Sequence, residues 1–353
     1  MKHYKTLLWA CVMMVFLVAC REPQTPHIKI VCTSDVHGNL FAYDFLSGDS
    51  MDGSLARVST YLKGLRQQDD NVIYIDNGDM LQGSPATYYY STHAVGHRHV
   101  AAEALNYMMC DAVVFGNNEI ELGGATYQRY ADELTCPVSG GNVMYEGSET
   151  PFLPPYTIVE RQGLKVAILG LTTPAIPHWI PKCQWPELEF VDMERSASRW
   201  MQHLRENQQA DLVIGLFHSG YEGGIVDEGY AENAARTVAE RVPGFDAIFY
   251  GHDHQPRVAE VVNQRGDTVL LLNPGRDARQ VATLDVTLSH DGKQMLKPSL
   301  VAMDGYTPDP AYMATFVPHM ERITKYVDRV IGTSTTEVAI RDALFGTSAL
   351  MDF

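Results

Sequence analysis

The chain has 353 residues, a formal net charge of −16 and an apolar share of 45%. This length allows one large hydrophobic core or two modest ones, and the apolar share is ordinary for a globular protein. The negative net charge argues against a protein that binds a nucleic-acid polymer, because such proteins neutralise phosphates with an excess of Lys and Arg. A small anionic ligand held by a local cluster of cations fits the charge better.

The first nineteen residues predict a secretion signal followed by a lipid anchor. Two lysines precede an apolar stretch, residues 7–18, which is too short to span a bilayer. The stretch ends in Leu-Val-Ala-Cys, which resembles the bacterial lipobox, so Cys20 is expected to carry the lipid. A plain signal peptide with a coincidental Cys is the alternative. Residues 20–26 would then form a tether, which predicts a location outside the cytoplasm on a bacterial membrane.

Four cysteines remain once Cys11 and Cys20 are set aside, namely Cys32, Cys110, Cys136 and Cys183. An oxidising compartment permits disulfides, and four cysteines allow three pairings, none of which the sequence favours. Buried single thiols are an equally good interpretation. The chain has no CxxC, so neither a zinc knuckle nor a redox pair is indicated.

Apolar runs alternate with helical patterns through the first two thirds of the chain. Buried strands are predicted at residues 27–34, 71–76, 111–115, 164–171, 211–217 and 245–250. Helices are predicted at residues 54–68, 100–109, 125–134, 193–208 and 231–241. This alternation predicts βαβ units, an α/β fold and a mostly parallel sheet.

Beyond Gln255 the pattern becomes that of antiparallel strands, predicted at residues 258–263, 268–273 and 280–288. Turns are expected between them at residues 264–267 and 274–279. An amphipathic helix at residues 310–330 follows, and the last 23 residues have the composition of a connector. We therefore expect a main domain at residues 27–306, followed by a helix and connector at residues 307–353.

Oxygen and imidazole side chains follow five of the predicted strands, which is where α/β folds place their ligand sites. Taken singly, each has an ordinary explanation, such as a turn, a helix cap or a hydrogen-bonded structural histidine. Their recurrence after strand upon strand instead predicts one metal centre. The candidate ligands are Asp35, His37, Asp79, Asn117, His218, His252 and His254.

Seven ligands, one of them shared, are enough to hold two divalent ions. Carboxylate, amide and imidazole groups without a thiolate suit Zn, Mn or Fe. Two such ions about 3.5–4 Å apart activate water and stabilise charge on a phosphoryl group. The chain has no serine-hydrolase elbow, dinucleotide fingerprint or Walker loop to support a different chemistry.

The order Asp-x-His, Gly-Asp, Gly-Asn-x-Glu, His and Gly-His-x-His is similar to that of the calcineurin-like metallophosphoesterases. The detail looks like their secreted 5′-nucleotidase and 2′,3′-cyclic-nucleotide phosphodiesterase branch, which residues 170–174, 218–220 and 342–349 also resemble. The resemblance runs from about residue 27 to the end. It implies a four-layer αββα sandwich with a C-terminal linker helix, and hydrolysis of nucleotides or cyclic nucleotides.

The resemblance also divides the ligands between two ions, with Asp79 shared. One ion would be held by Asp35, His37, Asp79 and His254. The other would be held by Asp79, Asn117, His218 and His252. A water between the ions would lose its proton readily and attack the phosphorus in line.

Asn118 departs from the family pattern, which places a catalytic histidine directly after the ligand asparagine. Glu121 falls where the carboxylate that supports this histidine would be. An amide donates a hydrogen bond to a phosphoryl oxygen but delivers no proton, and losing a general acid costs about 10²–10⁴-fold in rate. Three outcomes stay open. The chain could hydrolyse only esters with good leaving groups, or it could bind ligands with poor turnover. Alternatively, His93, His97 or His99 could supply the proton, although an exposed polar loop is the other interpretation of that segment.

Two further segments carry weaker predictions. Arg276 follows a predicted strand and could contact a substrate phosphate, although a hairpin turn explains that segment slightly better. His178 and Trp179 lie between two prolines and could line a pocket. Relatives of this branch continue into a C-terminal domain whose aromatic residues hold the base, so weak base selectivity is expected here. A catalytically weakened lipoprotein that captures metal and phosphate ligands is the alternative function.

Overall fold

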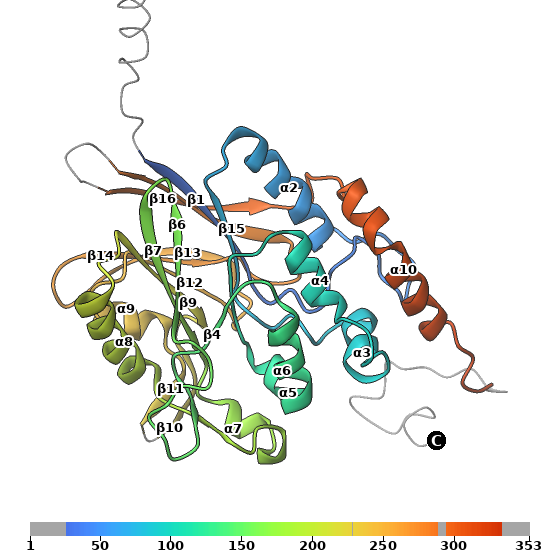
Figure 1. Cartoon of the computed structure of the whole chain (residues 1–353), viewed down its shortest axis with the longest axis horizontal. Coiled ribbons are helices and arrows are strands. Elements are labelled where there is room, and N and C mark those ends of the chain that lie inside the picture. The colour runs from blue at the N-terminus through green and yellow to red at the C-terminus, as the bar shows by residue number, and fades with distance from the viewer. Residues whose placement is uncertain (1–25, 228, 289–293, 334–353) are drawn as a thin grey trace, which may run out of the picture.

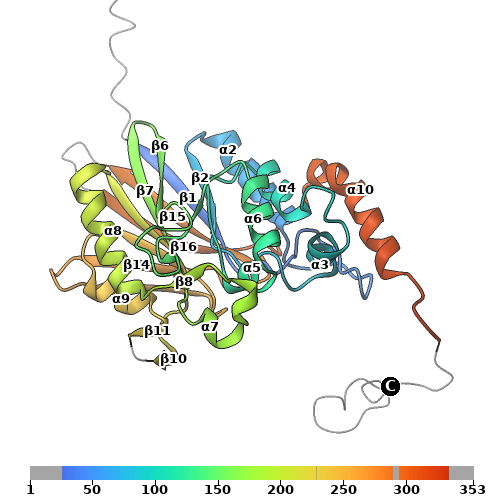
Figure 2. The ribbon, with the colours of Figure 1, turned by 60° about the horizontal axis from the view of Figure 1, so that its bottom comes forward.

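The computed structural model describes residues 26–227, 229–288 and 294–333. Two six-stranded sheets pack face to face, and helices cover the outer face of each (Figures 1 and 2). This is the four-layer αββα sandwich that the family resemblance implied, so the predicted fold class is confirmed.

The first sheet carries the N-terminal strands. In spatial order its strands are β16 (Gln294–Ala302), β15 (Gln280–Leu288), β1 (His27–Thr33), β2 (Val72–Asp76), β3 (Ala112–Val114) and β4 (Val138–Ser139). The strands β1 to β4 run parallel, whereas β15 and β16 are antiparallel additions. The carboxyl ends of β1, β2 and β3 therefore lie along one edge of the sheet.

The second sheet is built mainly from the middle of the chain. In spatial order its strands are β13 (Arg257–Val262), β14 (Thr268–Asn273), β12 (Ala247–Tyr250), β9 (Leu212–His218), β7 (Leu164–Thr172) and β6 (Tyr156–Arg161). The four central strands are parallel. Two short antiparallel pairs lie outside the sheets, β10 (Gly223–Asp227) with β11 (Tyr230–Asn233), and β5 (Val143–Tyr145) with β8 (Leu188–Phe190).

A cluster of aliphatic side chains fills the space between the sheets. Ile28, Ile30 and Ile73 from the first sheet meet Ile214 and Leu216 from the second, and all five are fully buried. Residues two apart share one face of a strand, so the other face of each strand is free to pack against helices. The inter-sheet core is what brings the strand ends of the two sheets together.

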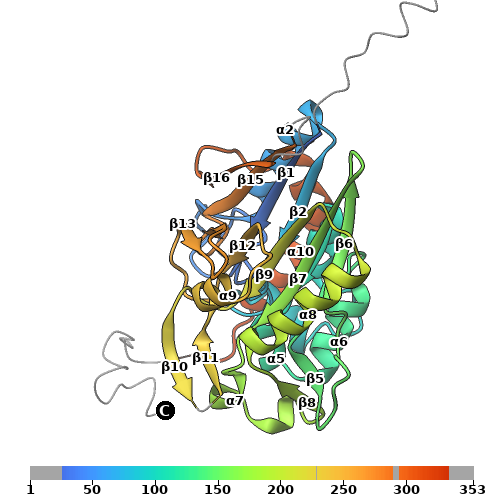
Figure 3. The same cartoon turned by 90° about the vertical axis from the view of Figure 1, so that its left-hand side faces the viewer.

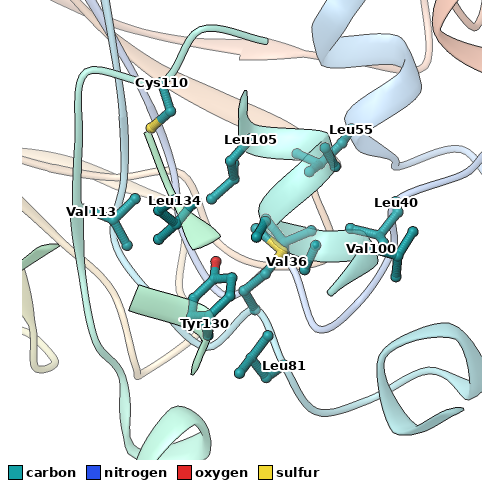
Figure 4. Close-up of a cluster of buried hydrophobic side chains, with 14 of the residues drawn as sticks. Val36, Leu40, Leu55, Leu81, Val100, Leu105, Cys110, Val113, Tyr130 and Leu134 are labelled. Carbon is teal, nitrogen blue, oxygen red and sulfur yellow. The ribbon is translucent and has the colours of Figure 1, made fainter. Parts of the chain in front are cut away.

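Helices cover both outer faces. The first sheet is covered by α2 (Leu55–Gln68), α3 (Pro85–Thr92), α4 (Val100–Tyr107), α6 (Gly124–Glu133) and α10 (Pro310–Val327). Leu105, Val113 and Tyr130 are part of the core beneath these helices (Figure 4). The second sheet is covered by α8 (Met193–Asn207) and α9 (Ala235–Arg241). Two short helices, α5 (Asn117–Glu121) and α7 (Ile176–Trp179), lie at the strand ends.

Most predicted elements are present within a few residues of their expected bounds, but two predictions are wrong. The helix expected at residues 231–241 begins only at Ala235, because residues 230–233 pair with β10 as strand β11. The strands β14 and β15 do not form a hairpin. Since β14 pairs with β12 and β15 pairs with β1, the segment between them crosses from one sheet to the other. The edge strand β16 was not predicted.

The predicted leader, Cys20 and most of the predicted connector fall outside the described residues. Among the helices of residues 26–333 that the structure describes, none combines the length and the apolar content needed to cross a bilayer. The cysteines Cys32, Cys110 and Cys136 are buried free thiols, and Cys183 is an exposed one.

Candidate metal centre

All seven predicted ligands lie in or beside the loops that follow parallel strands. Loops after β1, β2 and β3 carry Asp35, His37, Asp79 and Asn117, and the ends of β9 and β12 carry His218, His252 and His254. Two groups of these residues bring their ligand atoms within 4.8 Å of one another: Asp35 with His37 and His254, and Asp79 with His218 and His252. The resemblance placed the same three residues together in each case, but it also placed Asp79 in the first set and Asn117 in the second, and these two additions stay predictions.

The backbone at five of the seven ligands is left-handed. The φ angles of Asp35, His37, Asp79, His252 and His254 lie between +51° and +69°. This conformation is uncommon outside glycine and clusters at functional sites. Neighbouring glycines permit the close approach of the loops. A Cβ atom at Gly116 would overlap the Asp79 carboxylate and lie 2.7 Å from Cε1 of His218.

Several atoms in the centre lack the partner that a cation would supply. Nε2 of His218 and Oδ1 of Asn117 are buried without a hydrogen bond from the described residues. Nδ1 of His218 lies 2.7 Å from the Asn77 carbonyl, which leaves Nε2 to face the centre. Nε2 of His37 and Nε2 of His254 lie 3.0 Å apart. Orphaned buried acceptors are rare, so this set of groups fits divalent cations.

The electrostatics of the centre favour bound positive charge. Burial raises the pKa of Asp79, but the adjacent His218 outweighs burial and holds that pKa well below its usual range. Burial lowers the pKa of His218, whereas the Asp79 and Asp35 carboxylates raise it to about 10. The carboxylates are therefore ionised, and a proton stabilises them where a metal ion would do so in the loaded protein.

Glu119 holds two ligand loops together, and the sequence analysis assigned it no role. This fully buried carboxylate accepts backbone N–H bonds of 2.7–3.0 Å from Gly116, Asp79, Met80 and Leu81. It thereby fixes the Asp79 loop against the loop that carries Asn117. The Gly-Asn-x-Glu pattern contained this glutamate, but the spacing of the residues alone did not indicate that it joins the two loops.

Glu232 supports His252 from the β10–β11 pair, which lies with α5 and α7 at one end of the molecule (Figure 3). Oε1 of Glu232 is 2.9 Å from Nε2 of His252. A carboxylate on one ring nitrogen fixes the tautomer, which would leave the other nitrogen, Nδ1, available to a metal ion. The sequence analysis missed Glu232 because it lies in the segment that was wrongly expected to be helical.

Asn118 and Glu121 lie on α5 but do not contact each other in the structure. The Asn118 backbone N–H donates to Oδ1 of Asp79 at 2.9 Å, and its side-chain Nδ2 donates to Oδ2 at 3.1 Å. Asn118 thus orients the carboxylate that is predicted to be shared. Glu121 is exposed and accepts a hydrogen bond from Gln82 Nε2 at 3.0 Å, and the carbonyl of Gln82 lies 3.1 Å from Nδ1 of His37.

Arg276 lies at the rim of the centre, in the segment that crosses between the sheets. Its side chain is 56% exposed, and Nε is 3.4 Å from Oδ2 of Asp277. The Asp277 backbone N–H donates to the Asp35 carbonyl at 2.8 Å, which ties this segment to the centre. The Asp35 carboxylate raises the pKa of His254, and Arg276 is close enough to oppose that rise.

The three histidines considered as proton sources belong to the layer of α3 and α4. His99 is buried, its Nε2 lies 3.1 Å from Ser91 Oγ, and its Nδ1 caps α4 by accepting from the Ala101 N–H. Burial lowers the pKa of His99 to about 3, so its ring is neutral at pH 7 and is not the imidazolium that a general acid requires. His93 packs against the Tyr326 ring with 4.6 Å between centroids, and His97 is exposed.

Comparison with known proteins agrees with this geometry. The chain matches the family model of the calcineurin-like phosphoesterases over residues 28–256. It is 27% identical over 345 residues to a 2′,3′-cyclic-nucleotide 2′-phosphodiesterase/3′-nucleotidase of Haemophilus influenzae, covering 87% of this chain and 51% of that protein. It is 30% identical over 244 residues to the trifunctional nucleotide phosphoesterase protein YfkN of Bacillus subtilis, covering 65% of this chain and 16% of YfkN.

Solved structures share the fold. The calcineurin-like phosphoesterase YfkN of Bacillus subtilis superposes with a TM-score of 0.77 at 25% identity, covering 87% of this chain and all of that one. A putative 5′-nucleotidase of Staphylococcus aureus gives a TM-score of 0.76 at 22% identity, covering 90% of this chain and 62% of that one. The chain spans about half the length of the Haemophilus relative and of a Yersinia enterocolitica protein of the same name.

Proposed function

We propose, because this chain belongs to the calcineurin-like phosphoesterase family, that it hydrolyses phosphate esters of nucleotides or cyclic nucleotides with two divalent ions. The observation that carries the proposal is the convergence of seven oxygen and imidazole ligands from two sheets, with buried ligand atoms that lack a partner.

The ions would be held by the two groups of residues described above, with Asp79 between them and Asn117 completing the second group. When bound, such ions activate water and neutralise charge on a phosphoryl group. The contribution of the chain itself is to hold the ligands in place before substrate arrives. Glu119 fixes the Asp79 loop, Glu232 orients His252, and the Asn77 carbonyl orients His218.

The side chain of Asn118 decides which esters this chain can cleave well. Its amide is engaged with the Asp79 carboxylate and cannot give a proton to a departing oxygen. Esters whose leaving group is stable as an anion, such as aryl phosphates, avoid this requirement. We therefore expect aryl esters to be cleaved faster than nucleoside monophosphates.

A second candidate function is the capture of metal and phosphate ligands without efficient turnover. The residue at position 118 favours it, since the candidate ligands are all present but an asparagine occupies the position of the proton donor in the family pattern. The predicted leader and Cys20 would in either case tether the protein to a bacterial membrane outside the cytoplasm.

The two functions are separated by one set of assays on the purified chain. It is loaded with Mn²⁺ or Zn²⁺ and offered bis-aryl phosphate, a cyclic nucleotide and nucleoside monophosphates. Turnover that is lost in Asp79→Ala supports the hydrolase. Stoichiometric metal by elemental analysis with no turnover on any ester supports the capture protein, and absence of bound metal contradicts both.

A further inference from the structure

Trp179 is a large aromatic side chain exposed beside the metal centre. It ends α7, and its ring lies 5.5 Å from that of His252, tilted by 37°. The side chain is 41% exposed, whereas Trp185 and Trp200 are only 8% and 9% exposed. A tryptophan is among the residues that gain most from burial, so one that stays open next to a predicted metal ligand requires an explanation.

The exposure of Trp179 is not a result of a loose loop. Ile176 and Ile180, on either side of it, are buried at 0% and 4% exposure. The Ile180 backbone N–H donates to the Ile176 carbonyl at 3.0 Å, and the Trp185 indole N–H donates to the Ile180 carbonyl at 2.9 Å. Pro177 and Pro181 restrict the backbone further. The backbone that carries the indole is therefore well anchored, and the indole is exposed from an ordered segment.

The same loop is connected to the support of the metal ligand. Thr173 Oγ1 donates to the Glu232 carbonyl at 3.0 Å, and the Glu232 carboxylate lies 2.9 Å from the His252 ring. Glu232 of β11 thus contacts both the start of the loop that carries Trp179 and the imidazole of His252. A ligand on the metal centre would have a flat apolar surface at a fixed place beside it.

We infer that Trp179 is the stacking platform for the nucleobase of the substrate while its phosphate is at the metal centre. This inference rests on the proposed function and names the part of the substrate that the chain recognises. An indole face stacks on any base, because every base presents a π-face, and such contacts are tolerant of base identity. The platform therefore selects nucleotides over aliphatic phosphate esters without selecting among bases.

A second place for a base is less well supported. A cavity of about 640 Å³ is lined in part by Leu46, Tyr88 and Tyr326. Gln82 also lines this cavity, and its backbone carbonyl is hydrogen-bonded to His37. Its aromatic side chains come from α3 and α10, and among the described residues they make no hydrogen bond or ring contact with a predicted metal ligand. Trp179 packs directly against the ring of His252, a predicted metal ligand, so the observations favour Trp179 as the place for the base.

The kinetic test measures selectivity for a base. The ratio of kcat/KM for AMP to kcat/KM for glycerol phosphate is determined for the metal-loaded wild type, Trp179→Ala and Trp179→Phe. Loss of base stacking should lower this ratio about tenfold in Trp179→Ala, and the phenyl ring of Trp179→Phe should restore most of it. The matched control is Tyr145→Ala, an equally exposed aromatic at 41%, which should leave the ratio unchanged.

A binding measurement tests the platform without turnover. Stacking of a base on the exposed indole should quench tryptophan emission when AMP is added to the wild type, and Trp179→Phe should lose that quenching. Metal content is measured for each variant, so that a disturbed His252 is recognised. If the wild type hydrolyses no ester yet AMP quenches Trp179, the proposed function fails and the platform stands.

Two results would overturn the inference. One is an unchanged selectivity ratio and an unchanged quenching in Trp179→Ala and Trp179→Phe. The other is a tenfold fall of the ratio in Tyr88→Ala with none in Trp179→Ala, which would move the base to the cavity beside α3.

Discussion

The two sheets contribute different chemistry to one centre. The edge of the first sheet supplies both carboxylates and the amide, from Asp35, Asp79 and Asn117, together with the imidazole of His37. The edge of the second sheet supplies imidazoles alone. Each of the two ligand groups contains members from both sheets. Each predicted ion would therefore take ligands from both sheets, so the predicted centre is a product of the packing between them.

The two edges are also stabilised differently. On the first sheet one buried carboxylate, Glu119, fixes backbone N–H groups of two loops. On the second sheet each imidazole has its own support, such as the Asn77 carbonyl for His218 and the Glu232 carboxylate for His252. A change on the first edge should therefore disturb the whole centre, whereas a change on the second should weaken one ligand.

The largest effect is expected at the shared carboxylate of the first edge. Asp79→Ala should lower kcat/KM on bis-aryl phosphate by about 10³-fold, because it removes a preorganised charge from the place where both ions are expected. Steady-state kinetics with a matched metal analysis measures the loss. Asp79→Asn keeps the shape and removes the charge, so it should be nearly as inactive. Retention of a tenth of the activity in either variant would argue against a shared ligand.

An intermediate effect is expected at the support of the second edge. Glu232→Gln should weaken metal affinity about 10–100-fold, since the carboxylate orients His252. Competition with a chelator measures the affinity. Glu222→Gln is the control, because Glu222 lies near the same pair of strands and makes an exposed ion pair with Arg236. Equal affinities for the two variants would show that Glu232 has no such role.

A smaller gain is expected from restoring a proton donor on α5. Asn118→His should raise turnover of nucleoside monophosphates at least about tenfold, because a protonated imidazole assists departure of the alkoxide. Turnover of aryl esters should rise less, which makes the ratio of the two rates the decisive quantity. An unchanged ratio would indicate that another group already supplies the proton.

The smallest effect is expected on stability, and it arises in the helix layer at His99 and not in the metal centre. The pKa of His99 is about 3 in the folded chain and near 6.5 when unfolded, so the unfolded chain binds the extra proton as pH falls below 6.5. Stability is therefore lost on acidification, by about 1 kcal/mol from this group between pH 7 and 5.5. Urea unfolding of wild type and His99→Asn at both pH values should show that difference. Equal pH dependence in the two proteins would contradict it.

The sequence was sufficient to find the candidate ligands that the structure brings together, and insufficient to find the residues that support them. Buried parallel strands are continuous apolar runs, so their ends, and hence residues such as Asp35 and His218, can be located from pattern alone. Glu232 lies in a short polar strand whose pairing with β10 is set by tertiary context, and a helical pattern nearby obscured it. The crossing between β14 and β15 has the same explanation, because two strands joined by a turn look alike whether they pair or separate.

The left-handed backbone of Asp35, His37, Asp79, His252 and His254 has a consequence for engineering. Such a conformation costs a side-chain-bearing residue of order 1 kcal/mol or more, and glycine is exempt from most of that cost. Replacing the partly exposed His37 with glycine should therefore abolish ion binding while sparing the melting temperature of the ion-free chain. A scan of glycine substitutions that measures both ion binding and the melting temperature could then outline the predicted metal centre without any substrate.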